Sequence, residues 1–126
     1  MKALIWAGAM LAAGMATAAA QDLAAGEQSF RKCLPCHSVG EDARHKIGPT
    51  LNGLDGRKSG TMEGYNYSDA NKKAEIAWSE ASFKDYIANP MARVPGTKMA
   101  FAGIKNEKEI ADLWGYLKQF KADGKK

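Results

Sequence analysis

The chain has 126 residues, 45% of them hydrophobic, and this length argues for no more than one domain. The formal net charge is +4, and the charged residues are interspersed without a run of five or six of one sign. So small an excess of positive charge argues against general binding of polyanions, and no nucleic-acid partner is expected.

The first twenty residues have the pattern of a secretory signal peptide. A lysine near the start precedes an apolar run, and the segment ends in small residues that allow cleavage after Ala18 or Ala20. The strongly apolar stretch is too short to cross a bilayer, which takes about 20 apolar residues. We therefore expect residues 1–20 to be removed on export to the periplasm. This leaves a single domain over residues 21–126 that does not insert into a membrane.

Helices are predicted at both ends of this domain. A first helix is capped by Asp22 and runs to about Leu34. Its apolar stripe at helical spacing consists of Leu23, Gly26, Phe30 and Leu34. A glycine in mid-helix costs about 1 kcal/mol relative to alanine, and a close approach of another helix would explain Gly26.

The middle of the chain combines a long loop with short helices. The segment "KIGPTLNGLDGRKSGTMEGYNY", residues 46–67, is rich in glycine and shows no convincing alternation of a strand. An ordered loop of this length in a small domain favours a functional purpose, such as wrapping a cofactor. A short helix is predicted from Ser68 to about Ala74, and another from Ser79 to Ala88 that ends before Pro90.

The last predicted helix is strongly amphipathic. Asn106 is its cap, and Glu109 three residues later completes a capping box. Its apolar stripe comprises Ile110, Leu113, Trp114, Leu117 and Phe120. Gly124 and the lysines after it predict a frayed end.

Both cysteines and one of the two histidines lie in the stretch "KCLPCHSVG", residues 32–40. Cys-x-x-Cys-His in an exported protein is the signature of covalent haem attachment. Two thiols three positions apart can form thioethers with the two vinyl groups of one haem. The histidine beside them then reaches the iron as the proximal ligand. This assigns Cys33 and Cys36 to the thioethers and His37 to the iron.

Other chemistry for these residues is less consistent with the sequence. A redox dithiol would need a strand before it and a βαβ context, which the sequence lacks. Zinc needs four ligands, and beyond the motif only His45 is available, without the second half of a finger. A disulfide closing so small a loop would stabilise little.

The sixth iron ligand is expected to be a methionine sulfur. Three methionines follow the signal segment, namely Met62, Met91 and Met99. We favour Met99, because a Pro-Gly turn precedes it and it follows His37 by enough residues to reach the opposite haem face. Met62 and Met91 stay open as alternatives. Thioether ligation raises the reduction potential relative to two histidines.

Several segments in this order resemble the class I c-type cytochromes, most closely bacterial cytochrome c2 and mitochondrial cytochrome c. They are "GEQSFRKCLPCHSVG", "GPTLNGLDGRKSG", "GYNYSDANKKAEIAW", "YIANPMARVPGTKMAFAGI" and "ADLWGYLKQF". The resemblance covers nearly all of the domain. It implies the small all-α cytochrome c fold, in which N- and C-terminal helices cross and short helices and loops wrap one covalent haem c.

The resemblance also implies roles for single residues. Pro49 would accept a hydrogen bond from the ring of His37, and His45 would hold two loops together. Three residues match positions that hydrogen-bond a buried haem propionate, namely Arg57, Tyr67 and Trp78. Three others match a polar network beside the sixth ligand, namely Asn71, Tyr86 and Thr97. The positions of the helix crossing are matched by Gly26, Phe30, Leu113 and Tyr116.

A basic docking ring around the haem edge is implied, but it is thinner than in mitochondrial members. Lysines remain at four expected positions, namely Lys32, Lys46, Lys98 and Lys105. Gln28, Met91 and Ala92 stand where mitochondrial members carry lysine, and Arg93 lies nearby. If the ring is real, association with an acidic partner should fall steeply with salt.

The expected function is that of a soluble, monomeric, periplasmic electron carrier and not an enzyme. The resemblance implies a membrane cytochrome bc1 complex and a photosynthetic reaction centre or terminal oxidase as partners. A haem peroxidase would need an open sixth position and a distal acid–base residue. A gas-binding cytochrome c′ would carry the haem motif near its C-terminus, whereas here it lies near the start of the domain.

Overall fold

The computed structural model describes residues 8 and 21–126, so the predicted signal peptide lies outside the described residues apart from Gly8. The regular structure consists of five helices, α1 (Leu23–Phe30), α2 (Asp69–Lys73), α3 (Glu80–Ala88), α4 (Pro90–Arg93) and α5 (Glu107–Leu117). Over these residues the β-structure is limited to one isolated bridge between Lys58 and Ala77. The prediction of an all-α fold is confirmed. No helix within this range has the length and hydrophobicity to cross a membrane.

The first helix is shorter than the periodicity predicts. The side chain of Asp22 caps it by accepting a hydrogen bond from the backbone N–H of Ala25 (3.0 Å), but the helix ends at Phe30. The chain then continues in turns to residue 36. Leu23 and Leu34 are 42% and 44% exposed, so the ends of the predicted stripe are not core. The helix meets its neighbour at one crossing, and this buries only the middle of the stripe.

The short helices begin where the sequence predicts. Ser68 caps α2 and Ser79 caps α3, each by accepting a hydrogen bond from a backbone N–H in the first turn. Asn89 ends α3 as expected, but its side chain also caps α4, which the sequence analysis missed. Pro90 breaks one helix and starts the next, because proline at the first helical position sacrifices no backbone hydrogen bond.

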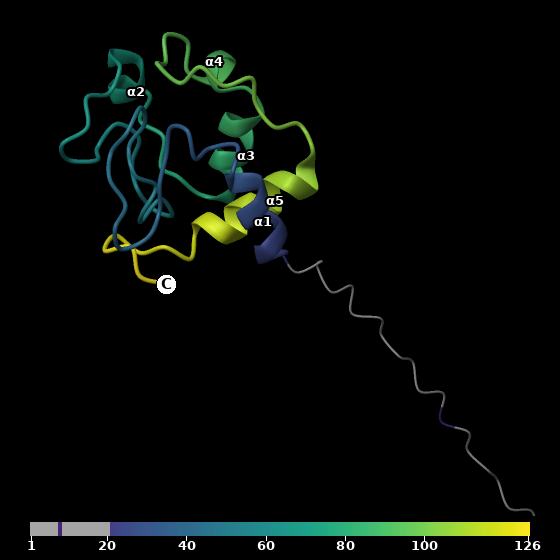
Figure 1. The fold of residues 1–126 in the computed structure, drawn as a ribbon. Coiled ribbons are helices and arrows are strands. Elements are labelled where there is room, and N and C mark those ends of the chain that lie inside the picture. Colours follow the sequence, from purple (N-terminus) through teal and green to yellow (C-terminus); the bar gives the residue numbers. More distant parts are fainter. Residues whose placement is uncertain (1–7, 9–20) are drawn as a thin grey trace, which may run out of the picture.

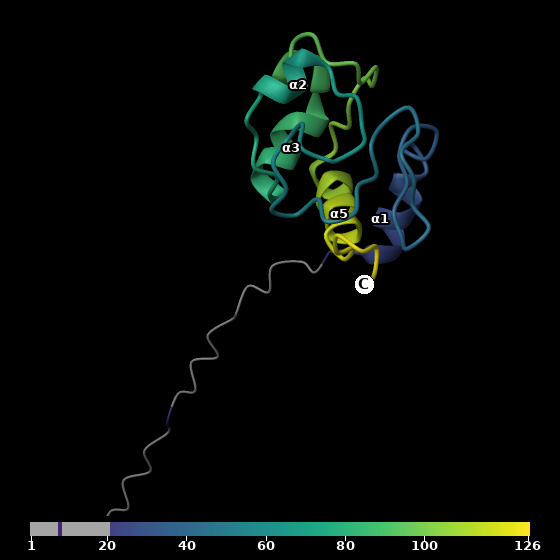
Figure 2. The ribbon, with the colours of Figure 1, turned by 90° about the vertical axis from the view of Figure 1, so that its left-hand side faces the viewer.

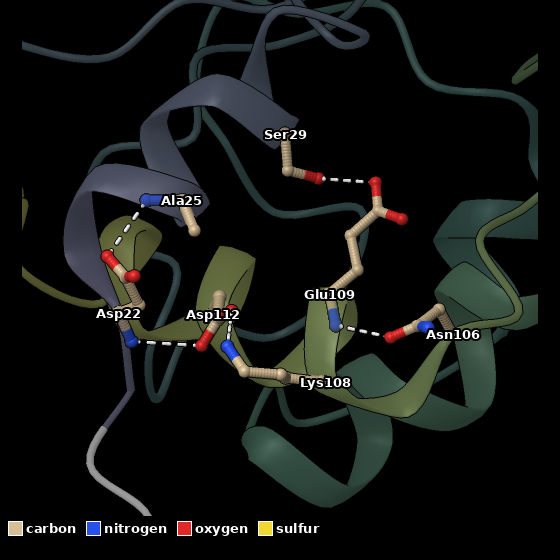
Figure 3. Close-up of polar contacts among 7 residues, drawn as sticks. All are labelled: Asp22, Ala25, Ser29, Asn106, Lys108, Glu109 and Asp112. Carbon is tan, nitrogen blue, oxygen red and sulfur yellow. Dashed lines mark hydrogen bonds and ion pairs between the residues drawn. The ribbon is translucent and has the colours of Figure 1, made fainter.

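The last helix is confirmed in its cap and its apolar face. Asn106 Oδ1 accepts a hydrogen bond from Glu109 N (2.9 Å). The whole predicted stripe is buried, namely Ile110, Leu113, Trp114, Leu117 and Phe120. The predicted capping box is wrong in its other half, because the Glu109 carboxylate accepts a hydrogen bond from Ser29 Oγ (Figure 3). The same carboxylate also pairs with Lys32 on the facing segment. The predicted frayed end is also wrong: after Leu117 the chain turns back and buries Gly124.

The helices α1 and α5 cross at Gly26 (Figure 1). A Cβ atom on Gly26 would lie 2.1 Å from the backbone oxygen of Asp112 and 2.8 Å from the Cβ of Tyr116. The ring of Phe30 packs on that of Tyr116, with centroids 5.6 Å apart. The predicted close approach is therefore confirmed. Gly26, Phe30 and Tyr116 lie at the crossing, and Leu113 lies in the core cluster beside it.

Polar contacts fix the same crossing from its edge (Figure 3). The buried carboxylate of Asp112 accepts a hydrogen bond from Asp22 N (2.9 Å) and pairs with Lys108 (2.7 Å). The hydrogen bond from Lys108, followed by that from Asp22 N, lowers the pKa of Asp112 below its ordinary value. In the second view, α5 lies between α1 on one side and α3 on the other (Figure 2). The last helix thus connects the two halves of the core.

We predict that Gly26→Ala lowers the free energy of unfolding by about 2–3 kcal/mol, the upper part of the usual range for overpacking. The added methyl group meets backbone, which cannot move without separating the helices. Urea unfolding measures the effect. Gly115→Ala on α5 is the matched control, because the three atoms nearest to its added methyl group belong to the side chain of Gln21 and not to backbone. Equal losses in the two variants would contradict the close-approach explanation.

Candidate haem site

A cavity between the helices and the long loop gathers most of the predicted site residues. Both predicted axial ligands, His37 and Met99, line it together with Cys33 and Cys36. So do the predicted polar residues Pro49, Arg57, Tyr67, Asn71, Trp78 and Tyr86. The apolar wall includes Leu54, Phe83, Ile87, Phe101, Leu113 and Leu117. Thr97 is not part of the lining, although it contacts a residue that is.

The turn after α1 places the cysteines and the histidine on one wall. The backbone N–H of His37 donates to Cys33 O (2.8 Å), which closes a helical turn over the motif. Both thiols are free in the structure, and Cys33 is 8% exposed. Burial, followed by the charge of Cys36, raises the pKa of the Cys33 thiol to about 11. A thiol with so high a pKa does not suit a reactive dithiol. Two sulfurs that line the same cavity, with Cys33 buried, do fit thioethers.

The imidazole of His37 is held by one hydrogen bond and one glycine. Its Nδ1 lies 2.8 Å from the carbonyl oxygen of Pro49, so this nitrogen carries the proton and donates. The other ring nitrogen, Nε2, keeps its lone pair for a metal. Burial is the main cause that lowers the pKa of His37 below its ordinary value, so the ring is neutral near pH 7. The predicted bond to Pro49 is therefore present in the structure.

Gly48 is a site residue that the sequence analysis missed. A Cβ atom on it would lie 2.3 Å from Cε1 and 2.7 Å from Nδ1 of His37. Only a residue without a side chain leaves room for the ring at this point. A glycine next to the proline of "IGP" was the signal available in the sequence, but the partner of the glycine depends on the fold.

The three candidate methionines lie in different surroundings. Met99 is half-buried and lines the cavity. Met62 lines a separate surface cleft beside His45, and Met91 is 52% exposed on α4. Among the described residues, Met99 is thus the methionine placed to reach a group in the cavity.

A polar network orients Met99. The hydroxyl of Tyr86 donates to its Sδ (3.1 Å), and the Met99 N–H donates to Thr97 Oγ1 (3.2 Å). Burial raises the pKa of Tyr86, while a hydrogen bond with Thr97 opposes the shift, so the hydroxyl stays protonated near pH 7. Asn71 lines the same cavity from α2, although its side chain does not join this network in the structure. Two of the three residues predicted here therefore contact the sulfur-bearing residue or its hydroxyl partner.

Arg57 places a half-buried cation on the cavity wall. Its Nη1 donates to the carbonyl oxygens of Thr50 (2.9 Å) and Asn52 (3.2 Å). None of the ion pairs among the described residues involves Arg57, and desolvation lowers its pKa. A half-buried guanidinium without a carboxylate partner fits an anionic group of a ligand. Tyr67 and Trp78 line the same cavity, so the three residues predicted for a propionate lie around one space.

His45 holds two loops together, as predicted, and leaves no ring nitrogen for a metal. Its Nδ1 accepts a hydrogen bond from Thr50 N (3.1 Å), so the proton sits on Nε2, which donates to Glu63 O (2.8 Å). Tyr65 adds a second contact between these loops by donating to Ile47 O (2.5 Å).

The four predicted docking lysines do not all lie together. Lys32 and Lys98 line the cavity, and Lys46 is next to Ile47, which lines it while 73% exposed. Lys46 Nζ donates to Leu34 O (2.5 Å) and Lys98 Nζ to Asn66 O (2.9 Å), while Lys32 pairs with Glu109. Lys105 donates to Ala88 O and lies outside the lining. The exposed residues of the lining, which mark the cavity mouth, therefore include Lys32, Lys98 and Ile47, and Lys46 is next to Ile47 in the chain.

Comparison with known proteins gives one matching family profile and several similar proteins. The sequence profile described as Cytochrome c matches residues 23–121. A cytochrome c2 of Rhodoplanes tepidamans is 66% identical over 84% of this chain and 99% of the relative. A cytochrome c2 of Blastochloris viridis is 56% identical over 100% of this chain and 99% of the relative. Cytochrome cH from Methylobacterium extorquens superposes with a TM-score of 0.73 at 43% identity, covering 78% of this chain and 98% of that one.

We predict that Gly48→Ala lowers the free energy of unfolding by about 2 kcal/mol, because its methyl group collides with the His37 ring. The proton on Nδ1 should exchange faster with solvent, as the ring moves away from Pro49. Urea unfolding and proton NMR measure the two effects. Ile47→Ala, at the exposed neighbouring residue, should stay within about 0.5 kcal/mol. A Gly48→Ala protein that behaves like Ile47→Ala would show that the glycine is not needed.

Proposed function

Since the chain belongs to the cytochrome c family, we propose that it is a periplasmic carrier of single electrons. The family implies one covalently bound haem c with iron, and the motif at Cys33, Cys36 and His37 fits that cofactor. The observation that carries the proposal is the cavity that this motif and Met99 line together. We assign residues 1–20 to a cleaved signal peptide and residues 21–126 to the cytochrome c domain.

The residues of the cavity divide between holding the cofactor and tuning it. Cys33 and Cys36 would form the thioethers, while His37 and Met99 would take the two axial positions. The haem iron supplies the one-electron couple. A propionate would lie against three residues of the wall, namely Arg57, Tyr67 and Trp78. The sulfur of Met99 would be kept in place by Tyr86 and Thr97, with Asn71 beside them.

The site suits electron exchange better than catalysis. With both axial positions filled from the protein, no position is left for a substrate. No carboxylate and no second histidine line the cavity in the described part of the chain, so a distal acid–base residue of peroxidase type is not available there. His45 is fully engaged by Thr50 and Glu63. We therefore propose a carrier and not an enzyme.

The cavity mouth indicates how such a carrier would meet its partners. Lys32 and Lys98 place positive charge at the mouth, Lys46 is next to Ile47 in the chain, and Ile47 offers an exposed apolar contact in the lining. Charges steer the encounter and the apolar group contributes at short range. A membrane cytochrome bc1 complex on one side, and a reaction centre or terminal oxidase on the other, are the proposed partners of a monomer. Lys105 contributes only at the periphery.

We predict that Met99→Ala abolishes the weak absorption band of the ferric protein that arises from sulfur–iron ligation. The reduction potential should fall as the thioether is lost and another ligand enters. Visible spectroscopy and potentiometry measure both. Met91→Ala, at the exposed methionine of α4, is the matched control and should leave band and potential unchanged. A band that persists in Met99→Ala would contradict the assignment of the sixth ligand.

We predict that Lys98→Gln, at a lysine of the cavity lining, slows association with isolated reaction centres about two- to fivefold at low salt, because one steering charge is lost. The difference should shrink as salt screens the remaining charges. Stopped-flow or flash kinetics across a salt series measure it. Lys118→Gln, at an exposed lysine outside the cavity lining, is the control. Equal effects of the two variants would mean that overall charge, and not the cavity mouth, steers the encounter.

A further inference from the structure

The segment that follows α5 folds back onto the loop that carries Pro49. We call residues 120–125 the clasp and residues 38–53 the proximal loop. In Figure 1 the yellow trace after α5 passes beneath the blue and teal loops. The sequence analysis expected this segment to fray, and none of the assigned site residues lies in it.

The clasp holds the proximal loop at both of its ends. At one end, Gly53 N donates to Phe120 O (2.8 Å), and a Cβ atom on Gly53 would lie 3.1 Å from Ala122 Cα. At the other end, the buried Gly124 lies against Gly40. A Cβ atom on Gly124 would be 2.2 Å from the backbone oxygen of Gly40. Gly124 has φ +82, which favours glycine. Both ends of the loop are therefore in van der Waals or hydrogen-bond contact with one short segment.

Inside the proximal loop the same ends are tied to each other. Asn52 Oδ1 accepts from Gly40 N and its Nδ2 donates to Gly40 O, both at 2.9 Å. Leu51 N donates to Ser38 O (3.1 Å). The side chain of Phe120 is 6% exposed, so the clasp is anchored in the core rather than lying loosely on the surface.

The span between these ties presents the backbone oxygens that the site depends on. Pro49 O accepts the hydrogen bond of the His37 ring (2.8 Å). Thr50 O and Asn52 O accept from Arg57 (2.9 and 3.2 Å). A shift at either end of the loop would move all three oxygens, because the ties leave the loop little internal freedom.

We propose that the clasp positions the proximal loop and so sets the strength of the His37–Pro49 hydrogen bond; this rests on the proposed function, in which His37 ligates the iron. Gly124 and Ala122 are positioning residues, acting through Gly40 and Gly53. A weaker bond makes the imidazole less basic and a poorer donor to the metal. Ferric iron loses more from this than ferrous iron, so the midpoint potential rises when the clasp is removed.

The experiment compares the holoprotein with two variants of the clasp. One is a chain shortened to end at Lys121, which keeps the buried ring of Phe120. The other is Gly124→Ala, whose methyl group collides with Gly40. Both should show a positive shift of the midpoint potential. The proton on His37 Nδ1 should also exchange several-fold faster with solvent, as followed by NMR.

Two controls separate positioning from loss of stability. Ile110→Val loosens the core on α5 but leaves the clasp intact, and Lys118→Ala changes an exposed side chain before it. Both should keep the parental potential and exchange rate. Clasp variants that match these controls would overturn the proposal. If the parent showed no methionine-ligated spectrum, the proposed function would fail, while the exchange rate of the ring proton would still decide the link between clasp and Pro49.

Discussion

The hydrogen bond from His37 Nδ1 to the carbonyl oxygen of Pro49 is the contact on which the site depends. It decides which ring nitrogen carries the proton and therefore which one faces the cavity with a lone pair. It also requires the turn after α1 and the loop before residue 50 to stand at a fixed separation. Gly48 makes that separation reachable, because any side chain there would occupy the space of the ring.

The cavity and the hydrophobic core are built from the same residues. Leu113 and Leu117 of α5 are almost fully buried and pack in the main core cluster, yet both also line the cavity. A domain of this size buries little apolar surface by itself. A bound apolar group would therefore complete the core. A haem held by thioethers stays attached to the unfolded chain, so it would stabilise the native state through the apolar surface that it buries there. The same helix therefore serves both packing and function, because α5 crosses α1 at Gly26 and also forms a wall of the site.

Local signals in the sequence predicted a large part of the structure. The helix caps at Asp22 and Asn106 are short-range features, and both lie where the sequence places them. The helices predicted from Ser68 and Ser79 begin one residue later, with these two serines as their caps. The spacing of the apolar residues in α5 was enough to identify its buried face. The Cys-x-x-Cys-His motif predicted the residues of one cavity wall, and the resemblance to cytochromes predicted most of the polar residues that line the cavity elsewhere.

Features that depend on tertiary contacts were missed or predicted wrongly. The carboxylate of Glu109 can either complete the capping box of α5 or contact the segment that α5 crosses. It contacts that segment, because Ser29 and Lys32 lie within reach there. The helical spacing of Leu34 looks like core, but the chain has left the helix by then. The docking of Gly124 on Gly40 joins segments more than eighty residues apart, and glycine and lysine at a chain end predict fraying when only local propensity is considered.

The central claim is that both axial positions are filled by this chain, so that electrons pass but no ligand binds. Carbon monoxide added to the reduced holoprotein tests it most directly. The account predicts a sharp low-spin spectrum that carbon monoxide does not shift, because His37 and Met99 hold the iron from both faces. A high-spin ferrous form that binds carbon monoxide would contradict it and would place the chain among ligand-binding haem proteins.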